Sequence, residues 1–157
     1  MGPVEAQAAA HKHAAVAEFI GYAPGLAATG FHPLDGARYL RDTEHAGIML
    51  CRLVAHHTCA IIEAEERGLA GILSLEFEPA PQELSSALTY CDITTSPDGE
   101  HVSARMRLAE IQQRYGPGHL VSRTMQRATP MIQRAVEQAQ DRSARSGELR
   151  RHEESAV

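Results

Sequence analysis

Apolar residues in this chain recur with helical spacing, and proline and glycine interrupt that spacing at several points along the sequence. No stretch shows the strict alternation of apolar and polar residues that is typical of a half-buried strand bounded by hairpin turns. Asparagine, which is common in hairpin turns, does not occur at all. The sequence therefore predicts an all-α fold, in the form of a compact bundle of several helices.

Residues 44–56 are expected to form the central core helix, with Thr43 as its N-cap. The broad apolar face of this helix consists of Ile48, Leu50, Cys51, Leu53 and Val54. Ser103 is expected to cap a further helix that ends at Tyr115 and is stopped by Gly116. The remaining expected helices cover residues 33–41, 61–67, 69–77, 82–94, 119–128 and 130–145.

The chain has 157 residues, the length of one domain, and a domain of that size buries roughly 70% of the surface that its unfolded chain exposes. A full hydrophobic core is therefore expected without disulfides. We divide the chain into an alanine-rich N-terminal helix over residues 1–19, a helical domain over residues 20–145 and a charged tail over residues 146–157. The tail is expected to be disordered.

The net charge of −5 argues against a nucleic-acid partner, because binding to a phosphate backbone needs a basic surface. Arginines crowd residues 105–151, and we interpret them as a solvated helix face. No window approaches the roughly 18 uninterrupted apolar residues of a membrane span, so no membrane is expected either. The three cysteines form no CxxC pair and follow no signal peptide, which indicates a reducing, cytoplasmic setting.

Three histidines and one aspartate lie on three different expected helical segments: His32, His56, His57 and Asp92. In an all-α fold such residues assemble a site between helices, and imidazole and carboxylate ligands suit Fe, Mn, Zn or Ni. Adjacent residues on a helix diverge by about 100°, so His56 and His57 are not expected to bind one ion together. The alternative is that the paired histidines complement the negative end of the helix dipole, with Asp92 as a polar edge residue.

Together with these residues, four segments make the chain resemble the HD-domain superfamily of metal-dependent phosphohydrolases, most closely its small bacterial and especially actinobacterial members. The segments occur in the family's order and lie within residues 20–141. They are IGYAPGLAATGFHPLDGARYLR, LVAHHTCAIIEAEERGL, ALTYCDITTSPDG and RLAEIQQRYGP.

The resemblance implies an all-α fold in which histidines and aspartates bind one or two divalent cations, such as Mn, Fe, Ni, Mg or Zn. In the family the metal polarises a phosphate ester and activates water. His32 matches the histidine of the family's HPxxGA segment, and His56 and His57 match its paired histidines. Asp92 resembles its distal aspartate ligand.

Two arginines lie one helical turn apart after the HPxxGA segment, Arg38 and Arg41. They are candidates to contact the phosphate oxygens of a substrate, and the alternative is that they form a solvent-facing helix edge. The substrate implied by the resemblance is a nucleotide or another phosphate ester. The expected partner is therefore a phosphorylated small molecule.

The sequence departs from the family directly before residue 20, where the family has its eponymous His-Asp doublet and this chain has Glu18 and Phe19. Phe19 has no donor atom, and the family's earlier histidine would fall ahead of Met1. A change in the contacts that support metal ligands typically lowers metal affinity or activity roughly 10 to 100-fold. Losing the ligands themselves should lower them further. Two functions are therefore predicted as alternatives: a metal-dependent phosphohydrolase, and a non-catalytic relative that binds a phosphorylated ligand or has a structural role.

Overall fold

The computed structural model describes residue 23 and residues 25–154, with side chains through residue 145. The helices in chain order are α2 (His32–Asp42), α3 (Ile48–His56), the 3-10 helix η2 (His57–Cys59), α4 (Ala60–Glu66), α5 (Ala70–Glu76), α6 (Gln82–Ile93), α7 (Ala104–Tyr115) and α8 (Leu120–Glu154). No strand occurs within this described part, where an isolated bridge joins Thr95 to His101. The predicted all-α fold is confirmed, whereas the helix predicted over residues 1–19 lies outside the described residues.

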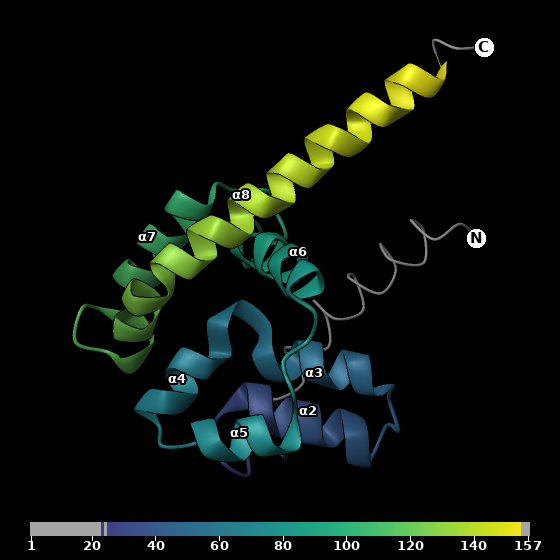
Figure 1. Cartoon of the computed structure of the whole chain (residues 1–157). Coiled ribbons are helices and arrows are strands. Elements are labelled where there is room, and N and C mark those ends of the chain that lie inside the picture. Colours follow the sequence, from purple (N-terminus) through teal and green to yellow (C-terminus); the bar gives the residue numbers. More distant parts are fainter. Residues whose placement is uncertain (1–22, 24, 155–157) are drawn as a thin grey trace.

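The helices form two layers (Figure 1). α2, α3, α4 and α5 make up the first layer, and α6, α7 and α8 make up the second. Apolar residues of the first layer meet in a core that contains Phe31, Leu34, Val54, Leu73 and Phe77, all fully buried. This core holds the helices that carry the histidines singled out above.

Apolar contacts join the two layers at two places. Ile62 of α4, Ile93 of α6 and Ile132 of α8 pack together in one core. Leu53 of α3 and Leu88 of α6 belong to another. The remaining space between the layers is the place where a site can form.

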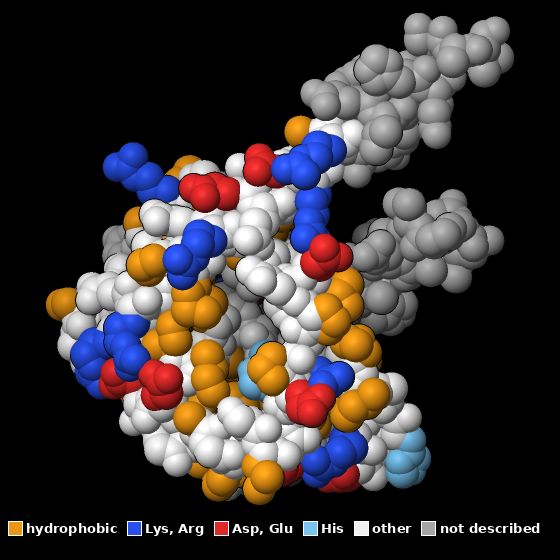
Figure 2. Space-filling view, in the orientation of Figure 1, with side chains coloured by type: hydrophobic (Ala, Val, Ile, Leu, Met, Phe, Trp, Pro, Cys, Tyr) orange, Lys and Arg blue, Asp and Glu red, His pale blue; other side chains and the backbone are white. Residues whose placement is uncertain are grey.

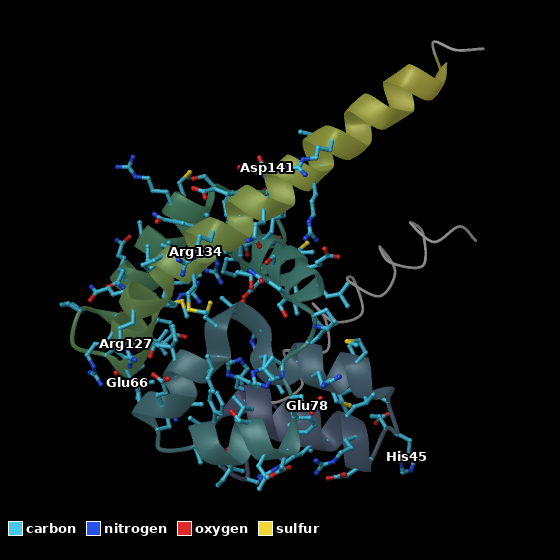
Figure 3. All side chains as sticks on the ribbon, in the orientation of Figure 1. His45, Glu66, Glu78, Arg127, Arg134 and Asp141 are labelled. Carbon is cyan, nitrogen blue, oxygen red and sulfur yellow. The ribbon has the colours of Figure 1, made fainter. Side chains whose placement is uncertain are left out.

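Ion pairs also join the layers, along the edge where α4 meets α8. Arg127 of α8 bonds to Glu65 and Glu66 at 2.7 and 2.8 Å. Figure 3 labels Glu66 and Arg127 close together at this edge, and Figure 2 shows basic and acidic side chains next to one another there. The arginines of residues 105–145 are exposed, as predicted, with the exception of Arg107.

α3 begins at Ile48, so the prediction of a helix from residue 44 with Thr43 as its N-cap is wrong. Thr43 instead ends α2, where its N–H donates to the Tyr39 carbonyl. The intervening residues reverse the chain, and His45 adopts a left-handed φ of 50° to do so. Of the predicted apolar face, Cys51, Leu53 and Val54 are buried, whereas Ile48, the first residue of the helix, is 58% exposed.

α8 is continuous through Pro130, where two helices were predicted. Proline removes one backbone hydrogen bond, and the buried Ala128 and Ile132 on either side keep the helix packed. The backbone stays helical to Glu154, which lies within the charged tail that was predicted from residue 146. This end of α8 projects beyond the layers in Figure 1. Neither α8 nor any other described helix is apolar enough over sufficient length to cross a membrane.

α7 begins and ends as predicted. The Ser103 hydroxyl oxygen accepts a hydrogen bond from the Met106 N–H over 3.2 Å, which satisfies one of the free donors at the helix start. Gly116 follows Tyr115 with a φ of 78°, a conformation that glycine adopts at low cost. These local signals set where α7 begins and ends.

Candidate functional site

A cavity of about 570 Å³ lies between the two layers. The start of α2, together with η2 and α4, contributes His32, His57, Thr58 and Arg67 to its lining. The helices of the second layer contribute Asp92 and a set of apolar and basic residues. Its volume falls within the roughly 300–1,000 Å³ that is usual for small-molecule sites. We take this cavity as the candidate functional site.

His32 and His57 face each other in the cavity, with their Nε2 atoms 3.1 Å apart. The His57 Nδ1 atom lies 2.6 Å from the Val54 carbonyl oxygen, which can only accept, so Nδ1 carries a proton. In the contact between the two Nε2 atoms, one ring donates and the other accepts. Burial, with the nearby charges of His57 and Arg67, lowers the pKa of His32 to about 3. The His32 ring is therefore neutral at physiological pH.

The turn between α3 and α4 brings Asp92 into contact with this region. Thr58 and Cys59 both adopt left-handed backbone conformations, with φ of 43° and 62°. The Thr58 hydroxyl donates to the Asp92 carboxylate, which lines the same cavity as the imidazole pair. Burial raises the pKa of the Cys59 thiol to about 11, so Cys59 is protonated and a poor nucleophile or metal ligand at neutral pH.

His56 lies apart from the cavity. Its Nε2 atom is 2.7 Å from the Phe77 carbonyl oxygen, so the ring donates to the backbone at the end of α5. Neighbouring residues on a helix point in different directions, which explains why the two paired histidines separate. The structure thus brings His32, His57 and Asp92 to one cavity and directs His56 elsewhere.

The facing imidazoles fit two ligands of a divalent cation. With metal–nitrogen bonds of about 2.1 Å, two bound nitrogens lie roughly 3.0–3.4 Å apart, and the His32 and His57 Nε2 atoms are separated by 3.1 Å. Among the residues that the structure describes, no three His, Cys, Asp or Glu side chains form a group that could hold a metal ion. The described donors therefore supply the imidazole pair but do not complete a metal centre by themselves.

Arg38 and Arg41 do not line the cavity. Both bond to the carboxylate of Glu76, Arg38 through Nε at 3.1 Å and Arg41 through Nη1 at 3.1 Å. Arg41 also pairs with Asp42, at 2.6 Å, and lies 5.0 Å from the centre of the Phe77 ring. These contacts hold α2 against α5.

Three other arginines line the cavity, and sequence reasoning missed them as site residues: Arg67, Arg107 and Arg114. Arg67 pairs with Glu63 at 2.7 Å, while Arg107 and Arg114 both pair with the single carboxylate of Glu110. Arg107 and Arg114 are separated by two helical turns and therefore share one face of α7. That spacing was visible in the sequence, but nothing local showed that the face meets a cavity.

A scan against protein-family models, a search of curated proteins and a search of solved structures found no match to this chain. The fold and the cavity therefore define it as an all-α protein with a partly polar cavity between two helical layers. Any finer assignment depends on the chemistry of the residues that line this cavity.

Proposed function

We propose that this chain is an HD-like helical domain that binds the phosphate group of a small phosphorylated molecule in the cavity between its layers. The observation that supports this proposal is the pair of α7 arginines, Arg107 and Arg114, which line the cavity and share the carboxylate of Glu110. Two guanidinium groups and one carboxylate leave one net positive charge on this face of α7, although the Asp92 carboxylate lines the same cavity. Guanidinium groups match the geometry of phosphate oxygens, so this charge suits a phosphate ester.

The opposite wall adds further hydrogen-bond donors. Arg67 contributes a guanidinium group, whose charge is balanced by Glu63. The facing His32 and His57 rings hold one Nε2–H between them, which a phosphate oxygen can accept in place of the second ring. Because water competes less for these groups in a partly buried cavity, each contact to the phosphate is stronger than on an open surface.

Calorimetric titration of the protein with inorganic phosphate tests this proposal. Replacing Arg107 or Arg114 by Gln is expected to weaken phosphate binding about tenfold, because a hydrogen bond to a charged group contributes roughly 1.5–3 kcal/mol. The matched control is Arg105→Gln, which changes an exposed arginine of the same helix that does not line the cavity. Equal losses in all three variants, or no binding to the wild-type protein, would contradict phosphate binding in this cavity.

A second candidate function is metal-dependent hydrolysis of a phosphate ester, favoured by the facing Nε2 atoms of His32 and His57. A bound divalent cation would supply polarisation of the phosphate and activation of water. His32 and His57 would hold the ion, and the Val54 carbonyl would keep the His57 ring in the orientation and tautomer that ligation needs. Thr58 would keep the Asp92 carboxylate at the same cavity.

Calorimetric titration of untagged protein with Mn²⁺, followed by an assay of phosphate release from an aryl phosphate, tests the second candidate. His57→Gln is expected to abolish Mn²⁺ binding and hydrolysis together. His45→Gln is the control, because His45 is exposed and lies at the far end of the first layer (Figure 3). Absence of Mn²⁺ binding to the wild-type protein would exclude this function and leave phosphate binding standing.

We also propose a cytoplasmic setting. Cys51, Cys59 and Cys91 form no disulfide with one another, the state that a reducing compartment maintains. Recovery of the protein in the cytosolic fraction, with all three thiols reactive after unfolding, is the expected result. Recovery in a secreted or periplasmic fraction would contradict it.

A further inference from the structure

The two walls of the cavity differ in character. The wall from the first layer carries the imidazole pair and Arg67 beside small side chains such as Pro33 and Ala60. The wall from the second layer carries Asp92 and the two α7 arginines, and it also includes a set of larger apolar side chains, here called the apolar wall. The apolar wall consists of Ile93, Ile111, Val121 and Met125. A ligand that fills the cavity must therefore meet both kinds of surface.

The apolar wall belongs to the packed interior of the molecule. Ile93 is 2% exposed and packs with Ile132, and Ile111 and Met125 lie against the same core. These side chains are held in place before any ligand arrives. Polar ligand atoms placed against them would lose hydrogen bonds to water without replacement, so apolar atoms are favoured there.

Most of the described lining groups that could bind a base or a sugar already have partners within the protein. None of the lining residues is Asn or Gln, Tyr115 is 41% exposed, and the Glu63 carboxylate pairs with Arg67. The hydroxyls of Thr58 and Thr124 already donate to Asp92 and to the Leu120 carbonyl. Base edges and sugar hydroxyls need hydrogen-bond partners once they leave water. The described lining therefore favours an aliphatic group over a nucleoside.

α7 carries both kinds of contact on one face. Arg107, Ile111 and Arg114 follow one another at spacings of four and three residues, and all three line the cavity. At a rise of 1.5 Å per residue, Ile111 lies about 6 Å along the helix from Arg107. A phosphate held by the two arginines therefore has the start of the apolar wall beside it.

We infer that the ligand of this cavity is an amphiphilic phosphate monoester, in which the phosphate carries an aliphatic chain. The inference rests on the proposed phosphate binding and names the class of molecule that is bound. The phosphate contacts Arg107, Arg114 and the imidazole pair, and the chain covers the apolar wall. The cavity volume of about 570 Å³ sets the upper limit on the length of chain that is buried.

Calorimetric titration of the full chain with a series of phosphates tests this inference. The series is inorganic phosphate, ethyl phosphate, butyl phosphate, hexyl phosphate, ribose 5-phosphate and AMP. Affinity is expected to rise along the alkyl series by up to about fourfold for each buried methylene, until the cavity is filled. Ribose 5-phosphate and AMP are expected to bind no more tightly than inorganic phosphate.

A pair of matched variants tests where the aliphatic chain of the ligand lies. Met125→Gln places an amide in the apolar wall and is expected to reduce the affinity for hexyl phosphate to that for ethyl phosphate, with inorganic phosphate unaffected. Met131→Gln makes the same change on the same helix at a residue that is 41% exposed and does not line the cavity. That control is expected to keep the full rise along the alkyl series.

The outcomes separate this inference from the function on which it rests. If inorganic phosphate binds but hexyl phosphate binds no more tightly, or AMP binds more tightly than hexyl phosphate, the inference is overturned and phosphate binding stands. If Met125→Gln and Met131→Gln reduce hexyl phosphate binding equally, the aliphatic chain of the ligand does not lie on the apolar wall and the inference fails. If the wild-type protein binds no compound in the series, including inorganic phosphate, the inferred ligand class and the proposed phosphate binding are both wrong.

Discussion

At the scale of single residues, the turn from His57 to Cys59 sets the direction of the side chains that matter most for the cavity. His57 is fixed by its Nδ1–H bond to the Val54 carbonyl, and Thr58 donates to Asp92. Both bonds depend on the left-handed backbone of Thr58 and Cys59, which costs a residue with a side chain about 1–2 kcal/mol. Such strain persists where surrounding contacts hold it, as the two bonds do here.

Glycine and alanine at position 58 provide a test of this turn. In ordinary helical conformations glycine is less stable than alanine by about 0.5–1 kcal/mol. At a φ of 43° the order is expected to reverse, so Thr58→Gly should be more stable than Thr58→Ala by about 1 kcal/mol. Both variants lose the hydrogen bond to Asp92, so that loss cancels in the comparison.

Urea unfolding of the two variants measures this difference. The same two substitutions at Thr129, inside α8, serve as the control and are expected to keep the ordinary order, with alanine more stable. A Thr58→Ala variant more stable than Thr58→Gly would show that position 58 does not adopt the left-handed conformation in solution.

At the scale of helices, Arg38 and Arg41 hold α2 against α5 through one carboxylate. Glu76 accepts hydrogen bonds from both arginines, and its side chain is 24% exposed. The bond from Arg38 is the largest cause that lowers the pKa of Glu76 below its ordinary value, and Arg41 adds to it. A partly buried carboxylate between two arginines is worth more than an exposed surface pair, which contributes roughly 0–1 kcal/mol.

The lowered pKa of Glu76 gives a pH-dependent contribution to stability. Its carboxylate stabilises the folded state fully above the unfolded pKa of about 4.3, and the contribution is lost as the pH falls through the lower folded pKa. Glu76→Gln is therefore expected to reduce the free energy of unfolding by about 1 kcal/mol at pH 7. At about pH 2, where the wild-type carboxyl is protonated, the difference should be close to zero.

Denaturant unfolding of both proteins at the two pH values measures this effect. Glu78→Gln is the control, because the Glu78 side chain is 80% exposed and pairs with Arg52 on the surface. A Glu76→Gln effect that is equal at both pH values would show that the carboxylate charge does not hold α2 to α5.

At the scale of the whole molecule, the cavity exists because two helical layers are held together around it (Figure 1). The α4–α8 edge is closed by the packing of Ile62 against Ile132 and by the pairing of Arg127 with two carboxylates. The first layer supplies the imidazole pair, and the second supplies Arg107, Arg114 and the apolar wall. A ligand that contacts both layers is therefore expected to stabilise their association, by an amount that grows with the logarithm of its concentration relative to its Kd.

The amino-acid sequence by itself determined the helical class, most helix positions and the cap of α7. These features depend on interactions between residues a few positions apart, such as Ser103 with the Met106 N–H. Apolar spacing likewise marked Leu34 and Val54 as core residues, and both are fully buried. Where local signals competed with packing, as at Pro130 in α8, the sequence predicted a break that the packed helix does not have.

The tertiary structure alone decided which polar residues meet. His32 and His57 are 25 residues apart, and Thr58 and Asp92 are 34 residues apart. Their contacts arise when two layers of helices pack, and no local pattern specifies which partner each side chain finds. The sequence marked the histidines as candidates by their residue type. It did not mark the cavity-lining arginines, and it did not show that a carboxylate pairs with Arg38 and Arg41.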